Sequence, residues 1–111
     1  MLNAGDLDQR ITLQQRSTGT DVLGQVSRTW VDVATVWAQA QPVRGREFFT
    51  ESGAAARADV RFRIRYRADV TAEWRVQWRG QPYVLVAAPM DVLGKKTTLE
   101  MMCAAGLGDA P

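Results

Sequence analysis

The sequence predicts a mainly β protein: one small barrel or sandwich of about six or seven antiparallel strands, with an inserted loop and short helix. Several short segments alternate apolar and polar residues, and clusters of turn-forming residues separate them. The 111 residues suffice for a single domain with one modest core. We therefore treat residues 1–111 as one domain.

The clearest strand alternates apolar residues and arginines one by one, over Val60, Arg61, Phe62, Arg63, Ile64, Arg65, Tyr66 and Arg67. Successive side chains of a β-strand point to opposite faces, whereas a helix would spread the arginines around its whole circumference. One face of this strand is therefore expected in the core, and the other carries four guanidinium groups.

The first half of the chain predicts three further strands. Residues 9–15 alternate around Ile11 and Leu13, and residues 17–25 contain turn formers that predict a loop. Residues 26–40 predict two strands separated by a kink, because Asp32 interrupts the apolar pattern.

Residues 44–59 read as a long excursion between two strands. Within it, residues 45–58 favour a short helix, since three consecutive alanines, Ala54 to Ala56, follow Glu47 and Glu51. Excursions of this length within a compact domain are commonly functional.

The second half predicts a strand near residues 74–79, a turn at Gly80, and a strand around residues 83–85. Residues 88–96 read as a loop and residues 97–104 as the last strand. Residues 105–111 are expected to form a flexible tail.

The tryptophans are expected in the core rather than on a base-stacking platform. Trp74 and Trp78 share a strand face with Val76, and Trp30 and Trp37 lie among valines and alanines. The single cysteine, Cys103, lies in an apolar run and is expected to be a buried small hydrophobe.

Composition argues against an enzyme. The chain has no histidine and one cysteine, so the commonest neutral-pH acid or base is missing and a structural zinc site is not expected. Phosphate-binding glycine motifs are absent, and the pair Glu47 and Glu51 fits a solvated helix face better than acid–base chemistry. We expect no cofactor, no metal, no signal peptide and no membrane span, and the lone cysteine favours a reducing, intracellular environment.

Basic charge is concentrated in one region. Seven arginines and three carboxylates lie between Arg57 and Arg79, whereas the whole chain has a net charge of +2. Arginine suits fixed, bidentate ion pairs better than lysine does. The arginine face of residues 61–67 is open to three interpretations: a solvated face, a protein interface, or a contact with nucleic-acid backbone.

Several segments, in this order, resemble the bacteriophage head-tail joining proteins, also called head-closure or stopper proteins. The element Gly5-x-Leu7-x-x-Arg10 leads into the first strand, and residues 23–25 and 30–38 form the most recognisable stretch. The remaining matches are residues 42–48, residues 63–67 with 70–71 and 74–76, and residues 80–83. The resemblance covers residues 4–104.

The resemblance implies a small β-barrel that assembles as a homo-oligomeric ring beneath the portal and adaptor proteins of the virion. Such a ring retains packaged double-stranded DNA and presents a docking surface for the tail. The protein would be made in the bacterial cytoplasm and would have no membrane partner. Rival functions are a tail-terminator ring and a single-strand nucleic-acid-binding barrel.

Two sets of candidate site residues follow. The arginine strand would be a ring interface or a DNA-facing surface, through Arg61, Arg63, Arg65 and Arg67. The excursion would form a channel loop, through Arg44, Arg46, Glu47, Phe48, Phe49 and Arg57.

Overall fold

A computed structural model describes residues 4–20, 26–49 and 55–106. Within these ranges the chain forms a short 3-10 turn, Ala4–Asp6, and seven β-strands. The strands are β1 (Gln9–Thr20), β2 (Val26–Phe49), β3 (Ala55–Arg65), β4 (Arg75–Trp78), β5 (Gln81–Leu85), β6 (Met90–Val92) and β7 (Thr98–Ala105).

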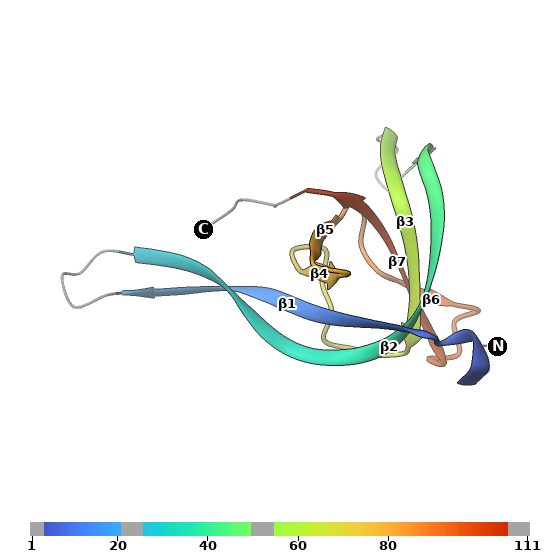
Figure 1. Cartoon of the computed structure of the whole chain (residues 1–111), viewed down its shortest axis with the longest axis horizontal. Helices are drawn as coiled ribbons and strands as arrows, with labels where there is room; N and C mark the ends of the chain where they lie inside the picture. The colour runs from blue at the N-terminus through green and yellow to red at the C-terminus, as the bar shows by residue number, and fades with distance from the viewer. Residues whose placement is uncertain (1–3, 21–25, 50–54, 107–111) are drawn as a thin grey trace.

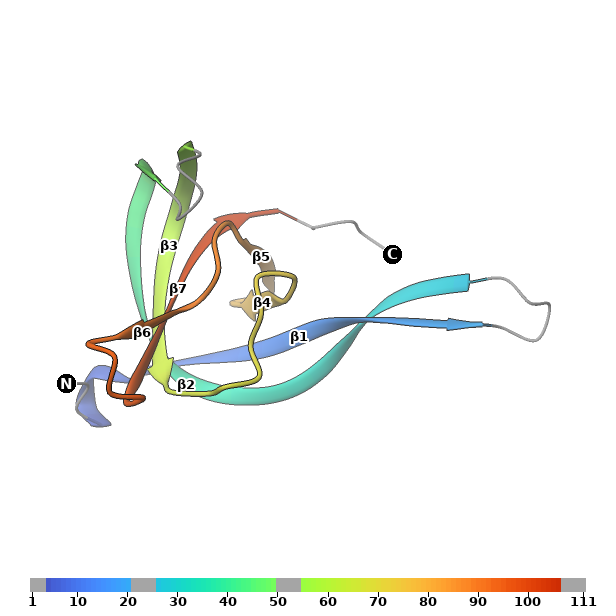
Figure 2. The same cartoon turned by 180° about the vertical axis from the view of Figure 1, so that it is seen from behind.

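The strands form one antiparallel sheet that closes on itself (Figures 1 and 2). Neighbouring strands follow the order β3-β2-β1-β4-β5-β7, and β7 pairs back with β3 to complete the ring. The short strand β6 lies along β7. Closure leaves few unpaired edges in this part of the sheet, and the predicted β-barrel fold class is confirmed.

The core fills the inside of the ring. Phe62, from the arginine strand, packs edge-on against Trp78 and Tyr83, with ring centroids 5.4 and 5.8 Å away. The predicted inward face of that strand is confirmed, since Val60, Phe62 and Ile64 are buried. Edge-to-face aromatic pairs add about 0.5–1.5 kcal/mol each beyond the area they bury.

One continuous strand, β2, replaces the two strands predicted over residues 26–40. The predicted kink is a β-bulge: Leu13 pairs with Ala34 and Gln14 with Asp32, so Val33 is the extra residue. A bulge bends a strand without ending it.

Strand β1 also continues beyond its predicted end, through residues 17–20, where the sequence predicts a loop. From Arg16 onward β1 pairs with β2 alone, out to the pair Thr20–Val26. Residues 16–20 and 26–30 therefore form a two-stranded arm, which we call the first arm, and it extends to the left in Figure 1.

The short helix predicted over residues 45–58 is wrong. From the irregularity between Pro42 and Arg46 onward, the described residues of this stretch form a two-stranded segment in which Arg46 to Phe49 pair with Ala55 to Ala58, while residues 50–54 lie outside the described residues. We call it the second arm, and it rises at the top of Figure 1. Helix propensity is a weak preference, and pairing between distant residues overrides it here. The ladder between β2 and β3 is irregular between Pro42 and Arg46 and then resumes.

The C-terminal half follows the prediction with one addition. β4 and β5 form a hairpin with a two-residue turn at Arg79 and Gly80, whose φ angles are 52° and 74°. The predicted loop of residues 88–96 contains the short strand β6, which the alternation rule missed because it is three residues long. Ala105 belongs to β7, and residues 107–111 of the predicted tail lie outside the described residues.

Candidate interaction surfaces

Arg61, Arg63, Arg65 and Arg67, which we call the arginine row, follow the outer face of β3 and the coil after it. Two of them share one carboxylate from β7: Glu100 Oε1 lies 2.9 Å from Arg63 Nε and 3.7 Å from Arg61 Nε. Arg61 also donates a hydrogen bond to the Gln41 side chain. This half of the row is therefore neutralised in part within the chain.

The other half of the row differs. Arg67 donates two hydrogen bonds to the Asp69 carboxylate, at 3.1 and 2.9 Å, and this contact lowers the pKa of Asp69. Arg65 is exposed, and no described residue forms an ion pair with it. The four arginines thus share a side of the strand, but not a chemical environment.

The predicted channel residues lie on the second arm. Arg44, Arg46, Glu47, Phe48 and Phe49 belong to the end of β2, where the structure describes the backbone alone. Arg57 lies opposite Glu47 in the ladder, and its side chain is exposed. The structure thus brings the six predicted residues onto one hairpin, while Glu51 lies outside the described residues.

Trp30 is not a core residue, contrary to the prediction. At the base of the first arm its ring contacts two guanidinium groups, that of Arg75 at 4.4 Å and that of Arg16 at 4.9 Å from the ring centroid. Arg75 is buried and donates to Gln14 Oε1 at 2.7 Å, and Gln14 donates to Asp32 Oδ1 at 2.7 Å. Burial lowers the pKa of the Arg75 guanidinium. The network braces the first arm against β4.

Trp37 is the clearest error of the core prediction, since 49% of it is exposed on β2. The Arg10 guanidinium lies 4.8 Å from its ring. Trp74 and Trp78, by contrast, are buried as predicted. The prediction rested on the apolar neighbours of Trp37, but in β2 Trp37 alternates with Val36 and the buried Ala38, so its side chain lies on the outer face.

Groups that could hold a metal ion do not gather in the part of the chain that the structure describes. There, no cluster of three or more cysteine or acidic side chains could hold a metal ion. The thiol of Cys103 is buried, as predicted, and burial raises its pKa. None of the described helical residues forms a segment long and apolar enough to cross a membrane.

Comparisons with known proteins agree with this architecture. Residues 2–106 match the family model of the phage head completion protein. Protein SF1141 from Shigella flexneri 2a, known from a solution structure, shares 31% sequence identity at a TM-score of 0.74, with 95% of this chain and 97% of that chain covered.

A chain from the virion of a native gene transfer agent particle has a similar fold, with a TM-score of 0.63 and 16% identity over 87% of this chain and 92% of that one. Among proteins with curated functions, none matches this sequence. The match to the family model spans nearly the whole chain, and the chain therefore belongs to the phage head completion proteins, a family of structural phage proteins.

Proposed function

We propose that this protein is a head-tail connector: a ring of identical subunits below the portal and adaptor that retains packaged DNA and offers the tail its attachment surface. Family membership over residues 2–106 is the observation that carries this proposal. In this role the protein would act in the virion, would need no cofactor, and would catalyse no reaction.

The two arms support a ring. A subunit of a ring contacts its neighbour through two different surfaces, so a protrusion on one side and a receiving face on the other favour closure by rotation. The first arm extends well beyond the closed part of the sheet (Figure 2), and the longest dimension of the molecule is 49 Å. We assign the first arm to the contact between neighbouring subunits.

The second arm suits the channel. It leaves the barrel in a different direction from the first arm (Figure 1) and carries three arginines and one glutamate among its predicted channel residues. Cationic side chains on a narrow hairpin can approach the phosphates of double-stranded DNA without reading its sequence. We assign this arm to DNA retention.

Shortening each arm tests these assignments separately. Replacing residues 47–57 by Asn-Gly joins the paired residues Arg46 and Ala58 through a two-residue turn. Added to DNA-filled heads that carry portal and adaptor, this variant should bind in normal copy number but fail to retain DNA. Retention equal to that of the parent protein would contradict the channel role of the second arm.

The matched variant shortens the first arm, replacing residues 18–28 by Asn-Gly between the paired residues Ser17 and Thr29. It should reduce the number of bound copies per head, because the subunit contact is lost. The same assay separates the rival functions. A tail-terminator ring would bind purified tails and not heads, and a single-strand-binding barrel would bind oligonucleotides as an isolated monomer.

A further inference from the structure

A cavity of about 400 Å³ opens at the end of the barrel where β2 and β3 diverge. The two strands pair from Gln39–Arg63 to the end of the second arm. Residues before Gln39 in β2 do not pair with residues after Arg63 in β3. The resulting fork is lined by apolar side chains from three parts of the chain, Leu7, Val36, Ile64 and Tyr66. We call it the barrel-end cavity.

The rim of the cavity carries an exposed aromatic ring with cationic side chains nearby. Trp37 and Arg65 both line the cavity, and Arg10 lies opposite Trp37 in the ladder between β1 and β2. Trp37 on β2 and Arg65 at the end of β3 are not paired in the sheet, but both residues line the cavity. Arg10, Trp37 and Arg65, from the neighbouring strands β1, β2 and β3, are the row that we consider at the rim.

The two cations of this row have no acidic partner among the described residues. Arg67 also lines the cavity, but its charge is already matched by Asp69. Arg10 contacts the Trp37 ring, and within the described residues the ion pairs of this region involve Arg61, Arg63 and Arg67 rather than Arg10 or Arg65. The rim thus retains two positive charges next to an apolar hollow.

We propose that the barrel-end cavity binds an extended acidic segment of a partner protein. An apolar side chain of the segment enters the hollow against Trp37, and carboxylates on either side of it pair with Arg10 and Arg65. Apolar anchors in pockets, with charge complementarity at the rim, are the usual form of such contacts.

The shape and charge of the cavity favour this partner over two others. A nucleic-acid backbone has phosphates but no aliphatic side chain to fill a hollow lined by Leu7 and Ile64. A second copy of this chain could present Leu93, which at 71% exposure is the most exposed large apolar side chain among the described residues, but Lys95 and Lys96 follow it in the same turn. Their charges would repel Arg10 and Arg65.

The inference goes beyond the proposed function, because it concerns the chemistry of a partner segment and can be tested on the isolated protein. The probe is an acetylated peptide amide, Gly-Glu-Phe-Glu-Gly. Binding is followed by NMR through the indole N–H of Trp37, which is assigned with a Trp37→Phe variant. We expect saturable shifts of this resonance with a Kd between about 0.1 and 1 mM.

Control peptides separate the two halves of the interaction. Gly-Gln-Phe-Gln-Gly lacks the carboxylates and Gly-Glu-Gly-Glu-Gly lacks the anchor, so each should bind about tenfold more weakly or not at all. Equal shifts with the glutamine peptide would overturn the acidic partner. A single-stranded oligothymidine that moves the Trp37 resonance at lower concentration than the peptide would assign the cavity to nucleic acid instead.

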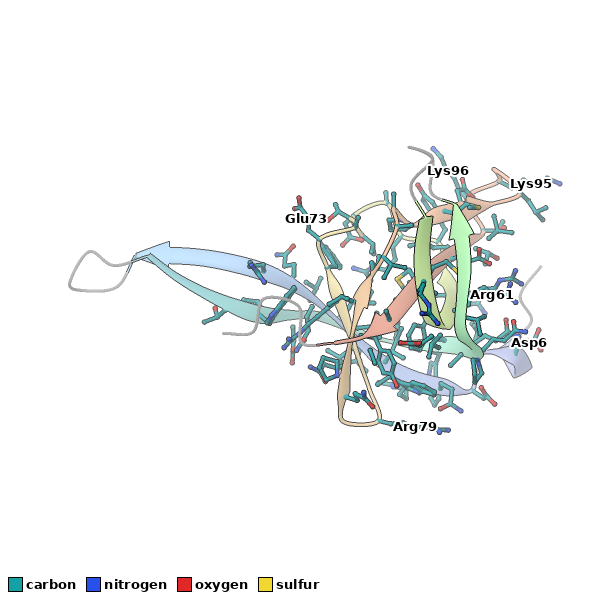
Figure 3. All side chains as sticks on the ribbon, turned by 90° about the horizontal axis from the view of Figure 1, so that it is seen from above. Asp6, Arg61, Glu73, Arg79, Lys95 and Lys96 are labelled. Carbon is teal, nitrogen blue, oxygen red and sulfur yellow. The ribbon has the colours of Figure 1, made fainter. Side chains whose placement is uncertain are left out.

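Variants test the residues. Arg10→Gln and Arg65→Gln should each weaken peptide binding about tenfold, since each removes one carboxylate partner. Lys95→Gln, at an exposed position in the turn after β6 (Figure 3), loses the same charge and should bind the peptide like the parent. Equal weakening by all three would mean non-specific attraction and would overturn the site. Loss of DNA retention in the arm variants is a separate result that this test neither needs nor affects.

Discussion

Glu100 holds a central place in the arginine row. Its side chain is largely buried, at 14% exposure, and its Oε1 atom lies near the Nε atoms of both Arg61 and Arg63. A carboxylate shared by two guanidinium groups fixes them on the sheet, and it leaves Arg65 as the row's exposed cation. The row therefore presents one fully available charge rather than four.

Replacing this carboxylate should destabilise the protein. Glu100→Gln leaves Arg61 and Arg63 without their shared acid, and we expect a loss of about 1–2 kcal/mol in the free energy of unfolding, because hydrogen bonds to charged groups contribute about that much. Chemical denaturation measures it. Glu73→Gln, at an exposed site in the turn before β4 (Figure 3), is the control and should change stability by less than about 0.5 kcal/mol.

Trp78 belongs to the buried aromatic cluster of the core. Its ring contacts Phe62 and Tyr83, and its Nε1 donates to Gln9 Oε1 at 3.1 Å. Trp78→Ala should lower the free energy of unfolding by about 3–5 kcal/mol, since it leaves a cavity among buried residues. Trp37→Ala is the control and should cost far less, because Trp37 is half exposed. Similar losses for both variants would contradict this core assignment.

The elements show where sequence patterns suffice. Strict alternation over residues 60–67 predicts an extended strand, and the structure confirms it up to Arg65. Residues 45–58 lack that alternation, so helix propensity was the remaining local signal. This helix propensity is overridden because Arg46 to Phe49 pair with Ala55 to Ala58 in the β2–β3 ladder. Strand pairing depends on contacts that a local pattern does not contain.

The turn between β4 and β5 gives a prediction at this scale. Gly80 has a positive φ and open space around the position of a Cβ, so Gly80→Ala should cost about 1 kcal/mol through backbone conformation alone. Thermal unfolding measures this. Gly5 also has open space but no positive φ, and Gly5→Ala should be close to neutral. A neutral Gly80→Ala would show that the turn relaxes into another type.

At the scale of the whole molecule, the closure of the sheet could not be predicted from the sequence. The pairing of β3 with β7 joins residues such as Arg63 and Glu100, and no local pattern indicates which strands meet. The same pairing determines which side chains meet on the surface. It brings Glu100 of β7 next to the arginine row, and β3 stays paired with β7 at Arg65, where it is no longer paired with β2 and the barrel-end cavity opens. The candidate arginines could be named from alternation, but their partners could not.

The last prediction asks whether the arginine row is a ring contact. Because Glu100 depends on Arg61 and Arg63, all three are changed to glutamine together, which removes the row's paired half without leaving an unmatched carboxylate. This triple variant loses one net positive charge. Lys95→Gln loses the same charge at an exposed position outside the row and is the matched control.

Both variants should remain folded, and they are then added to DNA-filled heads that carry portal and adaptor. If the paired half of the row contacts the next subunit, the triple variant should bind in reduced copy number, because breaking a desolvated charge contact costs several-fold to many-fold in affinity. Normal copy number with leakage of DNA would instead place Arg61 and Arg63 against phosphate. Normal binding together with full retention would mean that this half of the row faces solvent, where the Glu100 pairs serve the stability of the subunit alone.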